Sequence, residues 1–222
     1  MSRCFHGAGK IKVVRSDMRI NFLVVLTVLF SSLANGCNAQ DASVLNVIES
    51  NTELISLSEI CPSELVQAKD IPFDNKTDFC AENQQSCLSE CLKGSSDQCF
   101  GLANHLNISE VAEKYSRPLY AKSCALGLAS GCTNMAAGML HYKVPHKAEC
   151  YTNTFKKSCA LKDPWGCTMY AYNLVEGKGV QKSTDFALDA LKGSCRFGET
   201  DPACSAGLEL SNRILKGEFS GE

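Results

Sequence analysis

The sequence predicts an all-α fold, a solenoid of about four helix hairpins that are each stapled by a disulfide. Three observations favour this fold. Cysteine pairs recur about every 35 residues, the short blocks around them align with one another, and each second cysteine opens a segment of small and apolar residues. The four pairs are Cys91/Cys99, Cys124/Cys132, Cys159/Cys167 and Cys195/Cys204.

Residues 1–37 are interpreted as a secretory signal peptide. The apolar run Ile20–Phe30 follows Arg15 and Arg19, is short for a membrane span, and ends in small residues. Met18 is an alternative start, because an export signal that begins there has ordinary proportions. The basic residues upstream of Met18 leave a mitochondrial presequence open as an alternative.

The cleavage point of this signal has two interpretations. The stretch Leu33–Cys37 looks like a bacterial lipoprotein processing box, in which Cys37 would carry the lipid. A conventional peptidase would instead cut after Ala34 or Ala39. Plain export is favoured, so we expect a secreted or periplasmic protein, with a lipid anchor at Cys37 as the alternative. The chain would then meet a membrane only through the signal peptide or this anchor.

Residues 38–78 are predicted to form an N-terminal linker or cap. Their apolar residues follow a weak helical pattern that Pro62 and Pro72 interrupt. An uncovered first repeat would expose its apolar side to water, and a segment with one polar edge would cover it.

Each repeat is predicted to be a helix hairpin. The blocks Tyr120–Cys124, Phe155–Cys159 and Leu191–Cys195 align, and each is followed by a stretch with Gly or Pro that ends one helix and starts the next. Helix A therefore ends near the first cysteine, and helix B begins near the second. A disulfide requires Cα atoms within about 7 Å, which the facing ends of a hairpin satisfy, so pairing within each unit is the default.

The loop between successive units is clearest after the third hairpin. Gly177 and Gly179 are expected to end helix B, and Ser183 or Thr184 can cap the next helix A.

The stretch from Tyr120 to Val180 contains an aromatic residue, a Lys-x-Cys, a glycine turn, a Gly-Cys about eight residues later and a Gly-x-Gly-Val loop. In these features the chain resembles the Sel-one-like repeats, relatives of the tetratricopeptide repeats, and especially their secreted cysteine-rich branch. The resemblance covers four repeats in residues 79–215 and leaves 216–222 as a tail. It implies a right-handed α/α superhelix.

Some positions depart from this pattern. Gln98 replaces the glycine before the second cysteine of the first unit, and Gly193 replaces the lysine of the last unit, which also has one extra residue between its cysteines. Pro118 falls inside the expected helix A of the second unit, so we expect that helix to start near Ser116 or Arg117.

Fourteen cysteines indicate an oxidising compartment or a dense metal site. The chain contains no Cys-x-x-Cys, which favours disulfides. Cys80 with Cys87 is a plausible fifth bridge, and Cys61 and Cys150 remain as long-range partners. The pairing of these four residues stays open at this stage.

No metal or cofactor is predicted. Cys87 and Cys91 lie four residues apart, but we interpret them as members of different disulfides. The histidines of the expected exported part, His105, His141 and His146, are interpreted as surface residues.

Charge argues against nucleic-acid binding. The first 19 residues contain five basic residues and one acid, so the net charge of −2 for the whole chain becomes about −6 without them. Lys122 and Lys157 lie two residues before their cysteines, and Lys156 and Lys192 lie three before theirs. These lysines form either a modest basic stripe across stacked units or, as we favour, a solvated helix face.

A binding scaffold is the predicted function, because stacked hairpins present a concave face that suits a peptide, a cell-wall glycan or another protein. The chain is expected to be a monomer. The resemblance implies binding of β-lactam or peptidoglycan-derived ligands, with slow β-lactam hydrolysis as the alternative. No catalytic residue is predicted, because the chain lacks the Ser-x-x-Lys of serine β-lactamases. A second alternative, a respiratory-complex assembly factor of the mitochondrial intermembrane space, is disfavoured by the run Ile20–Phe30.

Trp165 lies in the turn between the helices of the third unit. It can either pack against Cys159/Cys167 or stand on the rim of a binding site. Packing is favoured, because large aromatic side chains are mostly buried.

Overall fold

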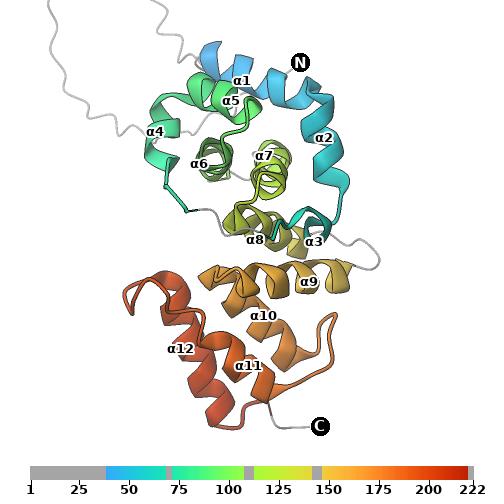
Figure 1. Cartoon of the computed structure of the whole chain (residues 1–222), viewed down its shortest axis with the longest axis vertical. Helices are drawn as coiled ribbons and strands as arrows, with labels where there is room; N and C mark the ends of the chain where they lie inside the picture. The colour runs from blue at the N-terminus through green and yellow to red at the C-terminus, as the bar shows by residue number, and fades with distance from the viewer. Residues whose placement is uncertain (1–38, 69–71, 108–112, 142–146, 220–222) are drawn as a thin grey trace, which may run out of the picture.

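The computed structural model describes residues 39–68, 72–107, 113–141 and 147–219 (Figure 1). These residues form twelve α-helices and one 3₁₀-helix, and they contain no β-strand. The predicted all-α class is therefore confirmed. The signal peptide of residues 1–37, the alternative start at Met18 and the lipidation of Cys37 lie outside the described residues.

Four short helices precede and begin the cysteine-rich region: α1 (Ala39–Ser50), α2 (Thr52–Glu59), α3 (Pro62–Leu65) and α4 (Thr77–Glu82). Four hairpins then follow, and in each the first helix packs against the second. Their helices are α5 (Gln84–Leu92) with α6 (Ser96–Leu106), α7 (Glu113–Ala125) with α8 (Ala129–Gly138), α9 (Lys147–Ala160) with α10 (Pro164–Glu176), and α11 (Thr184–Leu191) with α12 (Pro202–Leu215). The 3₁₀-helix Met139–His141 extends α8.

A disulfide closes each hairpin where its two helices meet. The bridges are Cys91–Cys99, Cys124–Cys132, Cys159–Cys167 and Cys195–Cys204, with Cα–Cα distances of 4.6, 4.6, 4.4 and 4.3 Å. Two further bridges, Cys80–Cys87 and Cys61–Cys150, span 7 and 89 residues of sequence.

The six disulfides are typical of a protein from an oxidising compartment. Among the described helices, none combines the length and the apolar character that a membrane span requires.

The Ser-Cys and Gly-Cys blocks have a steric explanation. A Cβ on Gly131 would lie 2.7 Å from the Ser123 hydroxyl oxygen, and a Cβ on Gly166 would lie 2.8 Å from the Ser158 Cβ. Ser123 and Ser158 are fully buried, so only glycine lets helix B approach helix A this closely. The serine also links units, because the Ser123 hydroxyl donates to the Ser96 carbonyl of the preceding hairpin at 3.0 Å.

The loop between the third and fourth hairpins has the expected ends. Gly177 is the left-handed C-cap of α10, at φ 69°. The Ser183 hydroxyl accepts the Phe186 N–H at 3.2 Å and so caps α11. A Cβ on Gly179 would lie 2.2 Å from the Ala148 backbone, so this loop packs tightly onto α9.

The expected start of helix A in the second unit was wrong. α7 begins at Glu113, not near Ser116 or Arg117, and Pro118 lies inside it. Pro118 is the sixth residue of α7, so its missing N–H removes a single bond close to the helix start. Tertiary packing compensates, because Leu119 and Tyr120 are both buried.

The predicted cap does more than cover the first repeat. α1 packs against α5 and α7, α2 against α7, and α3 against α7, α8 and α9. In Figure 1 this N-terminal segment curves around α5 and α7 and ends beside α9. The segment therefore follows the first helices of three successive hairpins, and Cys61–Cys150 joins it covalently to the third.

Candidate functional site

A groove crosses the ends of the hairpins where the second helices begin. One hollow of about 530 Å³ is lined by parts of α6, α8 and α10 and by residues 73–75. A second, of about 250 Å³, continues it toward Lys162 and Arg196. The two hollows share Phe73, Ser130, Asp163, Pro164 and Phe197, so they form one continuous groove.

Three partly exposed aromatic rings line this groove. Phe73 is 41% exposed, Trp165 44% and Phe197 58%. Phe73 is held edge-to-face against Phe100, with the ring centroids 5.2 Å apart. The Arg196 guanidinium lies over Phe197, 5.4 Å from the ring centroid. Rings fixed in this way offer flat apolar surfaces to a ligand at little cost in side-chain entropy.

The expected burial of Trp165 against Cys159–Cys167 was wrong. Trp165 belongs to the first turn of α10, directly after Pro164, and not to the inter-helix turn. Its neighbours Pro164 and Gly166 are buried, whereas Trp165 is 44% exposed and stands on the groove wall.

Asp163 organises the floor between the second and third hairpins. As the N-cap of α10 it accepts the Gly166 N–H at 2.7 Å. The same carboxylate accepts the Thr133 hydroxyl at 2.8 Å and the Ser130 hydroxyl at 2.6 Å. Asp163 is only 6% exposed, and these three donors compensate for the burial of its charge. The cluster fixes Ser130 and Thr133 at the groove wall.

Asn104 is held just as firmly at the other side of the groove. Its side-chain oxygen accepts the Tyr120 hydroxyl at 2.7 Å, and its amide nitrogen donates to the Thr77 hydroxyl at 3.2 Å. Burial raises the pKa of Tyr120 well above its ordinary value, so the phenol stays protonated and remains a donor. Asn104, Asn75 and Asn134 thus add amide groups beside the rings.

The arrangement of the groove suits recognition. Fixed aromatic rings can stack on an apolar face of a ligand, while amides and hydroxyls can bond to its polar edge. A sugar ring and an extended peptide both have this combination. Both carboxylates that line the groove already form hydrogen bonds within the protein. Asp163 accepts from three protein donors, and the Asp201 side chain accepts the Ala203 N–H at 2.9 Å.

The other face of the hairpins is not open in the same way. The first helices α5, α7 and α9 are covered by α1–α3. Of these two faces, the groove is therefore the open one.

Apart from Trp165, the candidate site residues singled out by the sequence do not line this groove. Cys87 and Cys91 belong to different disulfides, as interpreted from the sequence. His105 lies 3.3 Å from the Gln84 amide nitrogen, while the side chain of His141 and the whole of His146 fall outside what the structure describes. Sequence reasoning missed Phe73, Phe197 and Asp163. For Asp163 a signal existed, because Asp-Pro before a helix is typical of an N-cap.

Comparison of the chain with protein-family models, with curated proteins and with solved structures gives no match. The functional proposal therefore depends on the groove and on its chemistry.

Proposed function

We propose that this chain is an exported, disulfide-stapled repeat protein of the Sel-one-like kind that binds a ligand in the groove. Its hairpins form a right-handed solenoid, and the protein works as a monomer in a secreted or periplasmic setting. The ligand is a peptide or a cell-wall glycan, and the resemblance in residues 79–215 favours a β-lactam or a peptidoglycan-derived fragment.

The observation that carries the binding proposal is the set of exposed rings on a rigid frame. Phe73, Trp165 and Phe197 come from three separate parts of the chain, and each leaves over two-fifths of its surface in water. Exposure of aromatic rings that converge on one hollow is typical of binding surfaces. The staples Cys159–Cys167 and Cys195–Cys204 hold two of these rings in place before a ligand arrives.

The order of the helices supports the solenoid part of the proposal. From α6 to α11 each helix packs against the next one in sequence, and α10 also packs against α12. Neighbour-to-neighbour packing of this kind is the basis of repeat architectures.

Trp165 is the single tryptophan of the chain, so its fluorescence reports directly on the groove. We expect a muropeptide, which combines a disaccharide with a peptide stem, to change the emission of the oxidised protein in a saturable way. Phe197→Ala should weaken this binding about tenfold, because an aromatic contact contributes about 1–1.5 kcal/mol.

Phe186→Ala provides the matched control. Phe186 is 69% exposed on α11 but does not line the groove, so its removal should leave the affinity unchanged. Equal weakening by both variants, or no change in emission up to millimolar muropeptide, would refute the groove as the binding site. The same titration with a penicillin separates the two ligand classes. Nitrocefin turnover that follows protein concentration and survives a chelator would replace binding by the hydrolase alternative.

A further inference from the structure

The N-terminal segment, residues 42–66, is acidic. These residues include four glutamates and no lysine or arginine. The helices beneath the segment carry lysines at the contact, namely Lys114 and Lys122 on α7 and Lys157 on α9. The two surfaces therefore have complementary charge.

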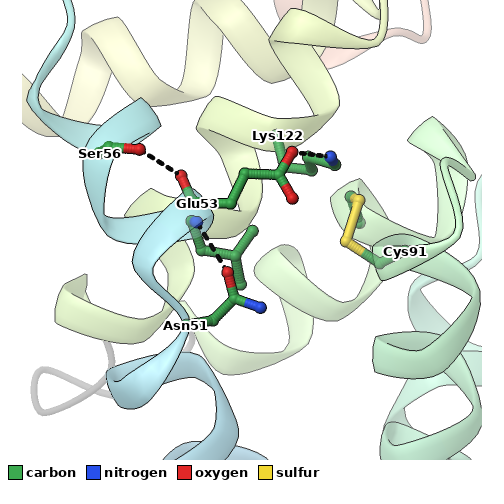
Figure 2. Close-up of polar contacts among 7 residues, drawn as sticks. Asn51, Glu53, Ser56, Cys91 and Lys122 are labelled. Atoms are coloured by element: carbon green, nitrogen blue, oxygen red, sulfur yellow. Dashed lines mark hydrogen bonds and ion pairs between the residues drawn. A yellow bond between two sulfur atoms is a disulfide. The ribbon is translucent and has the colours of Figure 1, made fainter.

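Polar contacts join the two surfaces along their length. Glu49 pairs with Lys114, and Glu53 pairs with Lys122, as Figure 2 shows for the second pair. Farther along, the Lys157 ammonium donates to the Ser63 carbonyl at 2.7 Å. The side chain of Lys122 is only 12% exposed, so its pairing is screened less than that of an ordinary surface pair.

Apolar side chains of the segment fill the same contact. Val44, Ile48 and Leu54 are at most 1% exposed, whereas Val47 and Ile55 on the other side are partly exposed. The segment is thus an amphipathic helical ligand by its chemistry, with a buried apolar stripe flanked by glutamates.

Two covalent connections join this segment to the hairpins. One is the peptide chain that continues from it to α4, and the other is the disulfide Cys61–Cys150. No cysteine of the segment takes part in the four hairpin disulfides, which all lie in residues 91–204. The apolar side chains of the segment share one core cluster with residues of α5–α8, so this cluster is the contact that a partner in trans would have to reproduce.

We infer that the face formed by α5, α7 and α9 is a second binding surface, specific for an acidic amphipathic segment of short helices, and that residues 42–66 occupy it in cis. A partner in trans would have the same chemistry as this segment, with glutamates beside an apolar stripe. This inference is independent of the proposed function of the groove.

Disulfide capture tests the surface despite competition from the cis segment. The full chain with Cys61→Ser leaves Cys150 free, and a synthetic peptide of residues 42–66 supplies Cys61 in a glutathione buffer. We expect the peptide to form its disulfide with Cys150 at least tenfold faster than a scrambled peptide of the same composition. Equal capture of both peptides would overturn the inference.

Charge variants locate the captured peptide. Lys122→Glu should lower the capture rate about fivefold, and a Glu53→Lys peptide should restore it. Lys156→Glu is the matched control, because Lys156 is exposed on α9 directly beside Lys157 and carries the same charge. If Lys156→Glu lowers capture as much as Lys122→Glu, general electrostatic attraction explains the result and the specific surface is refuted.

Hydrogen exchange on the oxidised wild type keeps the test decisive if the Cys61→Ser variant does not fold. Amides of residues 42–66 should open as one unit, at a lower free energy than those of α5–α10, and Lys122→Glu should speed only that unit. Exchange of residues 42–66 only together with the whole domain would show that the segment is an inseparable part of the core, and would overturn the inference.

Discussion

Replacement of Gly131 by alanine tests whether the Gly-Cys block exists to let the two helices of a hairpin approach. The new Cβ would lie 2.7 Å from the Ser123 hydroxyl oxygen and 2.9 Å from the Cys124 backbone nitrogen. Such overpacking costs about 1–3 kcal/mol, whereas alanine gains at most about 1 kcal/mol over glycine in a helix. Rotation of Ser123 away would break its bond to the Ser96 carbonyl, which adds about 1 kcal/mol. We therefore expect a net loss of about 2 kcal/mol.

Urea unfolding followed by far-ultraviolet circular dichroism measures this loss under oxidising conditions. The control is a double-mutant cycle with Ser123→Gly, which removes both side-chain atoms that the new Cβ would meet. The loss caused by Gly131→Ala should fall by about 1 kcal/mol or more in that background. If Gly131→Ala leaves the protein as stable as the wild type, or makes it more stable as helix propensity alone predicts, the close approach does not explain the motif.

Two further predictions concern the disulfides and pH. Replacement of Cys61 and Cys150 by serine should lower the free energy of unfolding by about 4.5 kcal/mol, whereas loss of Cys80–Cys87 should lower it by about 2.5 kcal/mol. The difference arises because the entropy that a disulfide removes from the unfolded chain grows with loop length. Equal losses in urea unfolding would contradict this prediction. Burial raises the pKa of Asp97, so its charge destabilises the folded state above that pKa. Asp97→Asn should therefore stabilise the protein at pH 7 by a few tenths of a kcal/mol. The gain should vanish below about pH 3.8, the ordinary value for the carboxyl, and a gain that persists there would exclude titration of Asp97 as its cause.

The hairpins could be predicted from sequence because their signals are local. Glycine turns, cap residues such as Ser183 and the short spacing within each cysteine pair all act within a few residues. Pro118 was misjudged for the same reason. Its local cost is real, but buried neighbours outweigh it, and sequence alone does not show that packing.

The course of the N-terminal segment and the groove could not be predicted, because both depend on contacts between distant residues. Cys61 and Cys150 are 89 residues apart, and no periodicity links them. Phe73 comes from outside the hairpins and joins the groove through its contact with Phe100. Trp165 was noticed, but its exposure depends on where the start of α10 faces in the folded chain.

One sequence unit produces both surfaces. In the second and third hairpins, the residues two positions before the first cysteine are Lys122 and Lys157, which contact the N-terminal segment. The residues two positions before the second cysteine are Ser130 and Trp165, which line the groove. The two positions of each hairpin therefore contribute to different surfaces, one covered by the N-terminal segment and one open in the groove.

The last hairpin differs from the second and third at this position. Gly193 stands two positions before Cys195, where the two preceding units have lysine. The N-terminal segment also stops short of this hairpin, since α3 ends against α9. Lysine therefore occurs at this position only in the second and third hairpins; the first hairpin, which α1 also covers, has Ser89 there, and in the last hairpin a Cβ at Gly193 would lie 2.5 Å from the Cys167 sulfur. The interpretation favoured from sequence, a solvated helix face, fails at Lys122, because this side chain is only 12% exposed and pairs with Glu53 of the N-terminal segment.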